Sequence, residues 1–164
     1  MKKFELTTET KVNFFGKTLL RIKALISFGD VIAGELGGWV ETEKNLAQDG
    51  DAWVSGDAEV YGDARVSGDA MVYGDAMVSG DAKVSGNARV YGNAWVYGDA
   101  DVSGDARVYG NAWVYGDAKV YGDAWVSGNA EVSGDAWVSG DAEVYGDAKV
   151  SGNARVYGNA DYAT

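Results

Sequence analysis

A six-residue repeat occupies most of this 164-residue chain and constrains its fold more than any other feature. From Gly50 the sequence reads Gly, Asp or Asn, Ala, a variable residue, Val, and Ser or Tyr, and then begins again. Val recurs at every sixth position from Val54 to Val156, eighteen times without interruption. A fixed short period is typical of a solenoid, in which each unit packs against copies of itself.

Each unit is interpreted as a short strand followed by a corner. Ala and Val alternate with outward residues, as in a strand that buries one face. Gly permits the positive φ of a tight turn, and we expect the Asp or Asn beside it to tolerate that conformation as well. A single unit buries too little apolar surface to offset the entropy of ordering it, so stability is expected to belong to the stacked array.

The units GDAxV[SY] resemble the hexapeptide repeats of left-handed parallel β-helices. In that family three hexapeptides form one triangular coil, which implies that residues eighteen positions apart lie one above the other. Eighteen units then predict about six coils, stacked ~4.8 Å apart. The expected fold class is all-β: a single-stranded left-handed parallel β-helix, a triangular solenoid, with a β-rich cap at its N-terminal end. The left hand comes from the resemblance alone, because parallel crossovers are otherwise right-handed in nearly all cases.

Residues 1–49 break the period, so we expect a capping segment over 1–49 and the β-helix over 50–164. Strand-like alternation on either side of Gly16–Lys17 predicts a hairpin with a two-residue turn. A solenoid needs its end covered, and a cap is the simplest interpretation of this segment. Residues 161–164 leave the other end weakly capped, and an open coil edge invites association.

The stretch FGDVIAGELGGWVETEKNLAQDGDAWV, residues 28–54, resembles the region where the β-helix begins in YdcK-type bacterial proteins and their prophage-borne relatives. The shared pattern is F-x-D-V-x-x-G-x-x-GGWV followed by N-L-x-Q-x-G. This resemblance implies a fold and no defined activity.

Charge is distributed unevenly along the chain. Residues 1–49 carry seven acids and seven bases, so the whole net charge of −11 lies in residues 50–164. An acidic rod disfavours direct binding of nucleic acid through its phosphates. The N-terminus is not a signal peptide, and no stretch approaches about 18 apolar residues. We therefore expect a cytoplasmic protein that binds neither nucleic acid nor membrane.

The chain lacks the residues on which the resembling enzymes depend. Hexapeptide acyltransferases generally use a His as general base, and the related carbonic-anhydrase type holds zinc with three His, whereas this sequence has no His and no Cys. It has no Gly-rich phosphate loop, nucleophile elbow or metal motif. Calcium-binding β-rolls repeat every nine residues, so the Asp and Asn here are interpreted as corner residues. We expect no enzyme activity, no catalytic residue, no cofactor and no metal.

Sorting the outward residues by eighteens assembles an uncharged aromatic patch on one side of the predicted rod. The candidate interaction residues are Met77, Trp95, Tyr97, Trp113 and Tyr115 on this side, with Tyr91 and Tyr109 round the corner. The corners beside it are Asn93, Asn111 and Asn129, where the acidic charge disappears. Exposed aromatic clusters mark protein interfaces, but cross-strand packing of the same rings would also stabilise a sheet. Ser and Tyr do not match preferentially at a spacing of eighteen, so both interpretations stay open.

The leading hypothesis is a non-catalytic repeat scaffold that acts by protein binding or self-assembly. Its partner is expected to be a second copy, packed side by side or through the C-terminal end, or a host protein if the gene is phage-borne. One alternative is an acidic inhibitor that imitates DNA and blocks a host protein. Others are a degenerate acyltransferase-like protein and a small-molecule sponge with pockets between subunits.

Overall fold

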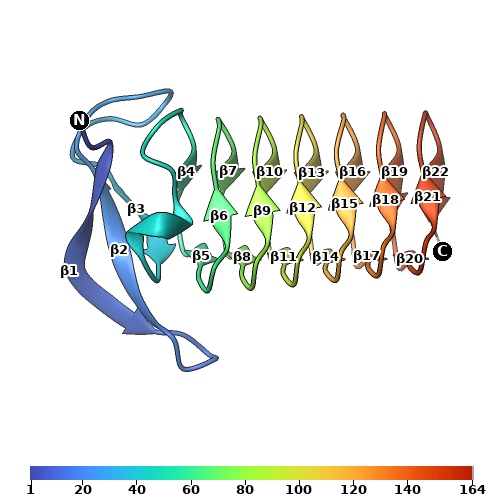
Figure 1. Ribbon diagram of the computed structural model, residues 1–164, viewed down its shortest axis with the longest axis horizontal. Helices are drawn as coiled ribbons and strands as arrows, with labels where there is room; N and C mark the ends of the chain where they lie inside the picture. Colours follow the sequence, from blue (N-terminus) through green and yellow to red (C-terminus); the bar gives the residue numbers. More distant parts are fainter. Residues whose placement is uncertain (164) are drawn as a thin grey trace.

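The computed structural model describes residues 1–163, which form a rod with a hairpin at its N-terminal end (Figure 1). The rod is an all-β solenoid of triangular cross-section, and each turn of the chain contributes one short strand to each of three parallel sheets. The predicted fold class is therefore confirmed. The helical content is one 3-10 turn, η1 (Glu43–Asn45), and no helix within residues 1–163 has the length and apolar character needed to cross a membrane.

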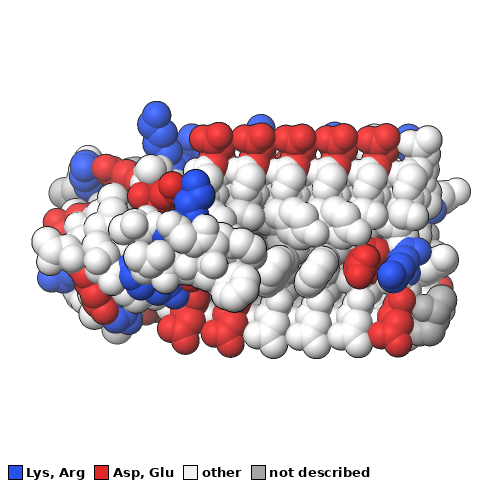
Figure 2. Space-filling model, turned by 90° about the horizontal axis from the view of Figure 1, so that it is seen from below, with Lys and Arg blue, Asp and Glu red and all other residues white. Residues whose placement is uncertain are grey.

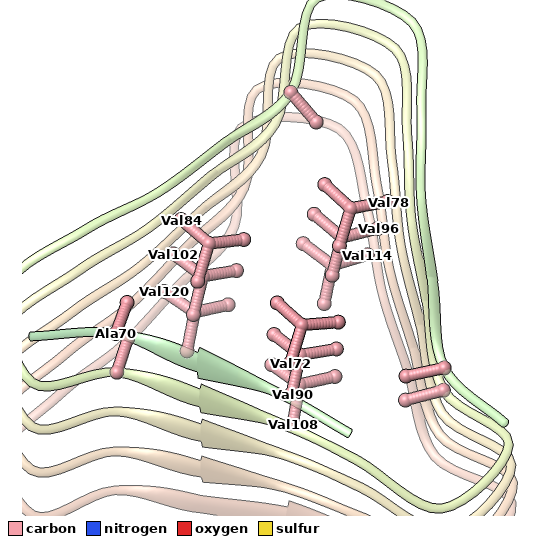
Figure 3. Close-up of a cluster of buried hydrophobic side chains, with 14 of the residues drawn as sticks. Ala70, Val72, Val78, Val84, Val90, Val96, Val102, Val108, Val114 and Val120 are labelled. Atoms are coloured by element: carbon pink, nitrogen blue, oxygen red, sulfur yellow. The ribbon is translucent and has the colours of Figure 1, made fainter. Parts of the chain in front are cut away.

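The solenoid is left-handed, as the resemblance implied. Seen along the axis, the chain passes from Val72 at the bottom to Val78 on the right and then to Val84 on the left (Figure 3). This path runs anticlockwise while the chain recedes from the viewer, and that combination defines a left-handed coil.

The strands group into three sheets by their position in the turn. The first sheet contains β1 (Phe4–Val12), β2 (Thr18–Ala24), β3 (Leu36–Val40), β5 (Glu59–Val60), β8 (Met77–Val78), β11 (Trp95–Val96), β14 (Trp113–Val114), β17 (Glu131–Val132) and β20 (Lys149–Val150). The second contains β4 (Trp53–Val54), β7 (Met71–Val72), β10 (Arg89–Val90), β13 (Arg107–Val108), β16 (Trp125–Val126), β19 (Glu143–Tyr145) and β22 (Asp161–Ala163). The third contains β6 (Arg65–Val66), β9 (Lys83–Val84), β12 (Asp101–Val102), β15 (Lys119–Val120), β18 (Trp137–Val138) and β21 (Arg155–Val156).

The register between neighbouring coils is eighteen residues throughout the repeats, as predicted. In the first sheet Trp95 pairs with Trp113 and Val96 with Val114. The backbone N–H of each coil donates to a carbonyl of the next coil; for example, Trp95 N lies 3.0 Å from Ala112 O. The Val and Ala side chains point inward, where the valines of the three sheets meet along the axis (Figure 3). The core is thus one continuous apolar column.

The repeat glycines allow the sharp corners. Gly110 has a φ of 68°, and a Cβ on it would lie 3.0 Å from the backbone N of Gly128 in the next coil. Both the left-handed backbone and the close approach therefore require glycine here. No residue other than Gly has a positive φ within 1–163, so the expectation that Asp and Asn share this conformation was wrong. The glycines supply all of the left-handed geometry.

The solenoid begins before the hexapeptide repeat does. β3 pairs in parallel with β5, and Leu46 forms a parallel bridge with Val66. The residues ahead of Gly50 thereby form an additional turn without showing the repeat. The rod has about seven turns, and the second sheet has one strand from each. The repeat count alone predicted about six.

The N-terminal hairpin extends the first sheet. β1 and β2 pair antiparallel, and β2 pairs antiparallel with β3. The predicted hairpin is present, but its turn spans Asn13 to Lys17 rather than two residues. The Asn13 carboxamide oxygen stabilises this longer turn by accepting hydrogen bonds from the backbone N of Phe15 at 3.0 Å and of Lys17 at 2.9 Å.

Two buried polar side chains satisfy backbone carbonyls at the start of the repeats. These carbonyls have no preceding repeat coil whose backbone N–H groups could donate to them. The Lys3 ammonium donates to the carbonyls of Gly50 at 3.1 Å and Ala52 at 2.8 Å. The Asn45 amide donates to Gly62 O at 3.1 Å and Ala64 O at 2.8 Å, at another corner of the triangle. These side chains replace the backbone donors that an earlier coil would supply.

Candidate functional site

The outward side of the first sheet carries a stack of aromatic rings. The rings of Trp95 and Trp113 lie 5.2 Å apart with planes at 6°, and those of Tyr97 and Tyr115 lie 5.0 Å apart at 2°. The two stacks contact each other edge to face, with Tyr97 6.3 Å from Trp113. Met77 precedes Trp95 in the register. We call these five residues the aromatic face.

The other two predicted patch residues lie round the corner. Tyr91 and Tyr109 follow β10 and β13 in the second sheet, and they stack on each other at 5.0 Å. Tyr73 extends this column, at 4.8 Å from Tyr91. Burial raises the pKa of Tyr91, and the neighbouring phenols of Tyr73 and Tyr109 add to that shift. This column flanks the aromatic face and does not belong to it.

Two rows of corner residues border the aromatic face. One is the asparagine row, Asn93, Asn111 and Asn129, whose amides form a hydrogen-bonded ladder. Asn93 Nδ2 donates to Asn111 Oδ1 at 3.3 Å, and Asn111 Nδ2 donates to Asn129 Oδ1 at 3.1 Å. This edge is uncharged beside the tryptophans (Figure 2).

The opposite border is the acidic row, which consists of Asp63, Asp81, Asp99, Asp117 and Asp135. Figure 2 shows it as a continuous red line along one edge of the rod. Desolvation raises the pKa of Asp99, and the negative charges of Asp81 and Asp117 raise it further. The aromatic face therefore separates a negative edge from a neutral one.

The N-terminal hairpin contributes an aromatic residue to this side of the rod. Phe15, in the hairpin turn, contacts Trp95 at 5.8 Å and Tyr61 at 6.4 Å between ring centroids. Glu59 anchors the hairpin, because its carboxylate pairs with Lys11 Nζ at 3.0 Å and accepts a hydrogen bond from Asn13 Nδ2 at 3.4 Å. Sequence reasoning missed the contribution of Phe15, because nothing in the repeat indicates where a non-repeated hairpin will lie.

The cap also covers two side chains that the repeat places outward. Glu59 is buried beneath the hairpin, and Trp53 is 2% exposed. The Trp53 ring lies between Phe28, at 5.4 Å, and Phe4, at 6.5 Å. The expectation that these two positions face solvent was wrong, because residues 1–35 pack over the first coil.

Trp125 and Trp137, on the other two sheets, have cations above them. Arg107 lies 5.3 Å from the ring of Trp125. Trp137 lies between Lys119, at 5.4 Å, and Arg155, at 4.2 Å. Within the described chain, no such cation covers Trp95 or Trp113. A partner can thus contact this stack without displacing a cation, although Glu131 borders it next to Trp113.

One carboxylate beside the aromatic face is buried. Glu59, the one acid buried within residues 1–163, is held by Lys11. No group of three or more His, Cys, Asp or Glu residues in that range could hold a metal ion.

Comparison with known proteins places the repeats in a described class. Segments 58–73, 64–80, 82–98, 100–116 and 148–160 match the model of the YdcK β-solenoid repeat. These segments carry YdcK-type β-solenoid repeats. The "Uncharacterized acetyltransferase YdcK" of Escherichia coli (strain K12) is 39% identical over 61 residues, which cover 33% of this chain and 19% of that protein. The chain thus matches about a fifth of that relative's length.

Proposed function

We propose that this YdcK-type solenoid is a non-catalytic scaffold that binds protein through its aromatic face. The observation that carries the proposal is the Trp95–Trp113 stack, which has no cation above it and lies beside the uncharged asparagine row. Tryptophan and tyrosine dominate the binding energy of protein interfaces, because each buries a large area at a small cost in side-chain entropy. A regular rod holds these rings in fixed positions, so little ordering is left to be done on binding.

Acetyl transfer is the alternative that the name of the E. coli relative raises. Acyl transfer requires a general base within reach of the attacking group. The described residues provide no His, and the buried carboxylate of Glu59 is already paired with Lys11. Calorimetric titration with acetyl-CoA tests this alternative: saturable binding in the micromolar range would favour it over the scaffold.

Imitation of DNA is a second candidate, favoured by the continuous acidic row in Figure 2. Two features weaken it. The acids of the rod are interrupted by bases, because Lys83 and Lys119 lie on the strands next to Asp101 in the third sheet. The aromatic face beside the row also has no counterpart in the phosphate backbone of DNA. A DNA-handling enzyme bound only at low salt would support mimicry.

Capture of partners by paired variants tests the scaffold. Immobilised wild-type protein, Trp95→Ala/Trp113→Ala and Trp125→Ala/Trp137→Ala are each incubated with bacterial lysate, and retained proteins are identified by mass spectrometry. Light scattering of the purified proteins reports self-assembly in parallel. The proposal expects a partner, or a second copy, that is lost only in the Trp95/Trp113 variant. Equal retention by both variants, or a monomer that retains nothing, contradicts it.

A further inference from the structure

An apolar groove lies where the hairpin tip meets the aromatic face. It has a volume of about 410 Å³ and is lined by Phe15, Tyr61, Met77, Ser79, Trp95 and Tyr97. Phe14, next to Phe15 in the hairpin turn, is 92% exposed. The apolar surface therefore continues from the hairpin turn through the groove and onto the ring of Trp113.

The shape of this region selects a narrow occupant. Figure 1 shows the hairpin tip standing away from the rod near β5 and β8. A broad, flat surface that approached the first sheet would meet the hairpin before it reached Trp95. A single segment that runs along the rod can enter the groove beside the hairpin and still contact the whole aromatic face.

The spacing of the rings favours a helix. The stacked rings recur every 5.0 to 5.2 Å along the rod. Side chains on one face of an α-helix recur about every turn, at a pitch of ~5.4 Å. Side chains on one face of an extended strand recur only every ~6.7 Å. A helix that lies parallel to the axis can place one apolar side chain against each of Met77, Trp95 and Trp113 over three turns.

The charge pattern favours a basic helix. One border of the aromatic face is the acidic row and the other is the asparagine row, so beside Trp95 and Trp113 the surface attracts positive charge on one side only. At Met77 the second border carries Asp75, so both borders are acidic there. A second copy of this chain offers the opposite chemistry, because its repeats carry the whole net charge of −11. Within residues 1–163 it also has no α-helix to present.

We infer that the groove and the aromatic face hold a basic amphipathic α-helix of a partner protein. The helix lies along the rod axis, with its apolar side chains between Phe15 and Trp113 and its lysines or arginines toward the acidic row. This inference rests on the proposed function and names the partner's chemistry. The difference between the two borders sets which way the helix faces. Its basic flank gains electrostatic attraction beside the acidic row and none beside the neutral asparagine row.

Synthetic peptides test the inference directly. The probe is a peptide of about 18 residues, long enough to be helical in water, with Leu at i, i+3, i+4 and i+7 and a Lys row on one flank. Fluorescence anisotropy of the labelled probe measures its binding to the full chain. One control peptide has the same composition in scrambled order, one alternates Leu and Lys as a strand does, and one has Glu in place of Lys. Binding of the helical probe at least about tenfold tighter than all three is expected.

Matched protein variants locate the binding. Trp95→Ala/Trp113→Ala is expected to weaken the probe at least about tenfold, and Trp125→Ala/Trp137→Ala to leave it within about twofold. Asp81→Asn/Asp99→Asn/Asp117→Asn should weaken it and reduce its salt dependence, unlike Asp105→Asn/Asp123→Asn on a different corner of the rod. The inference would be overturned if the two tryptophan variants weakened the probe equally, or if the two aspartate variants did. It would also be overturned if the strand peptide bound as tightly as the helical probe.

The outcome also separates this inference from the function on which it rests. If the helical probe does not bind while a lysate partner is still lost in Trp95→Ala/Trp113→Ala, the helix is wrong and the scaffold stands. If neither the probe nor any partner depends on Trp95 and Trp113, both proposals are wrong.

Discussion

The indole rings of Trp95 and Trp113 stack in parallel, 5.2 Å apart, although the two residues are separated by a complete turn of the chain. The backbone ladder between β11 and β14 fixes this separation, so the rings cannot be moved apart without disrupting the sheet. The same ladder aligns Tyr97 with Tyr115 at 5.0 Å. A short repeat thereby becomes an ordered row of aromatic side chains on one side of a rod.

Trp113→Ala should cost little stability. The Trp113 side chain is 38% exposed, whereas Val114, next to it, is fully buried. Loss of the ring stack is expected to lower the free energy of unfolding by about 1 kcal/mol. Val114→Ala, which leaves a cavity in the column of valines, should lower it by about 2–3 kcal/mol. Urea unfolding followed by circular dichroism measures both values, and an equal cost would mean that the ring stack serves packing rather than contact.

Lys3→Met and Asn45→Leu should each destabilise the fold. Either change leaves the carbonyls of a first-coil corner without a donor, and an unsatisfied buried polar group costs about 1–3 kcal/mol. Lys2→Met is the matched control, because the Lys2–Glu43 pair at 2.9 Å is exposed and such pairs contribute about 0–1 kcal/mol. Thermal unfolding of the three variants compares them, and a similar midpoint shift for Lys2→Met and Lys3→Met would contradict the end-capping role.

The corner glycines should differ in their tolerance of a methyl group. Gly110→Ala forces a left-handed backbone on alanine and brings its Cβ within 3.0 Å of Gly128 N. Gly152→Ala has a similar φ of 61° but meets nothing within 4 Å. The left-handed conformation alone costs about 1–2 kcal/mol, so Gly152→Ala should lose about that much and Gly110→Ala clearly more. The urea midpoints of the two variants measure the difference. An equal loss of stability in Gly110→Ala and Gly152→Ala would mean that the contact with Gly128 does not matter.

Stability should increase as the pH falls from neutral. Desolvation, followed by the charges of neighbouring aspartates, raises the pKa of Asp99 and of Asp123 above that of an unfolded aspartate. Between the two pKa values the folded chain binds more protons than the unfolded chain, so folding is favoured as the pH drops through the folded pKa. The gain is complete below the unfolded pKa of ~3.9.

Asp99→Asn/Asp123→Asn tests the origin of that dependence. The variant should be more stable than wild type at pH 7, and its urea midpoint should change less between pH 7 and pH 4. Glu43 has the opposite effect on the pH dependence of stability, because a hydrogen bond from Lys2 lowers its pKa. The control is Asp30→Asn, which also removes one carboxylate but leaves the corner rows of aspartates intact. An unchanged pH profile in the double variant would show that repulsion within the rows is unimportant.

The fold of the rod can be predicted almost entirely from the sequence, whereas the position of the hairpin on the rod cannot. The six-residue period predicts the Val and Ala core, the three sides and the pairing of Trp95 with Trp113, because each repeated unit meets the same surroundings. Phe15 and Trp95 are brought together only by the path of a non-repeated hairpin, whose pairing shifts register between Leu6 and Thr10. Lys3 resembles a surface lysine in the sequence, and its burial depends on carbonyls almost fifty residues away. The aromatic face could thus be predicted, and the groove beside it could not.

Site-specific photo-crosslinking in living bacteria tests the central claim most directly. A benzoyl-phenylalanine replaces Trp113 in one protein and Trp125, which is equally exposed at 38%, in another. The scaffold account predicts a discrete crosslinked product with another protein from position 113 and none from position 125. Products from both positions alike, or from neither, would contradict the claim that the aromatic face of the first sheet is where this protein meets its partner.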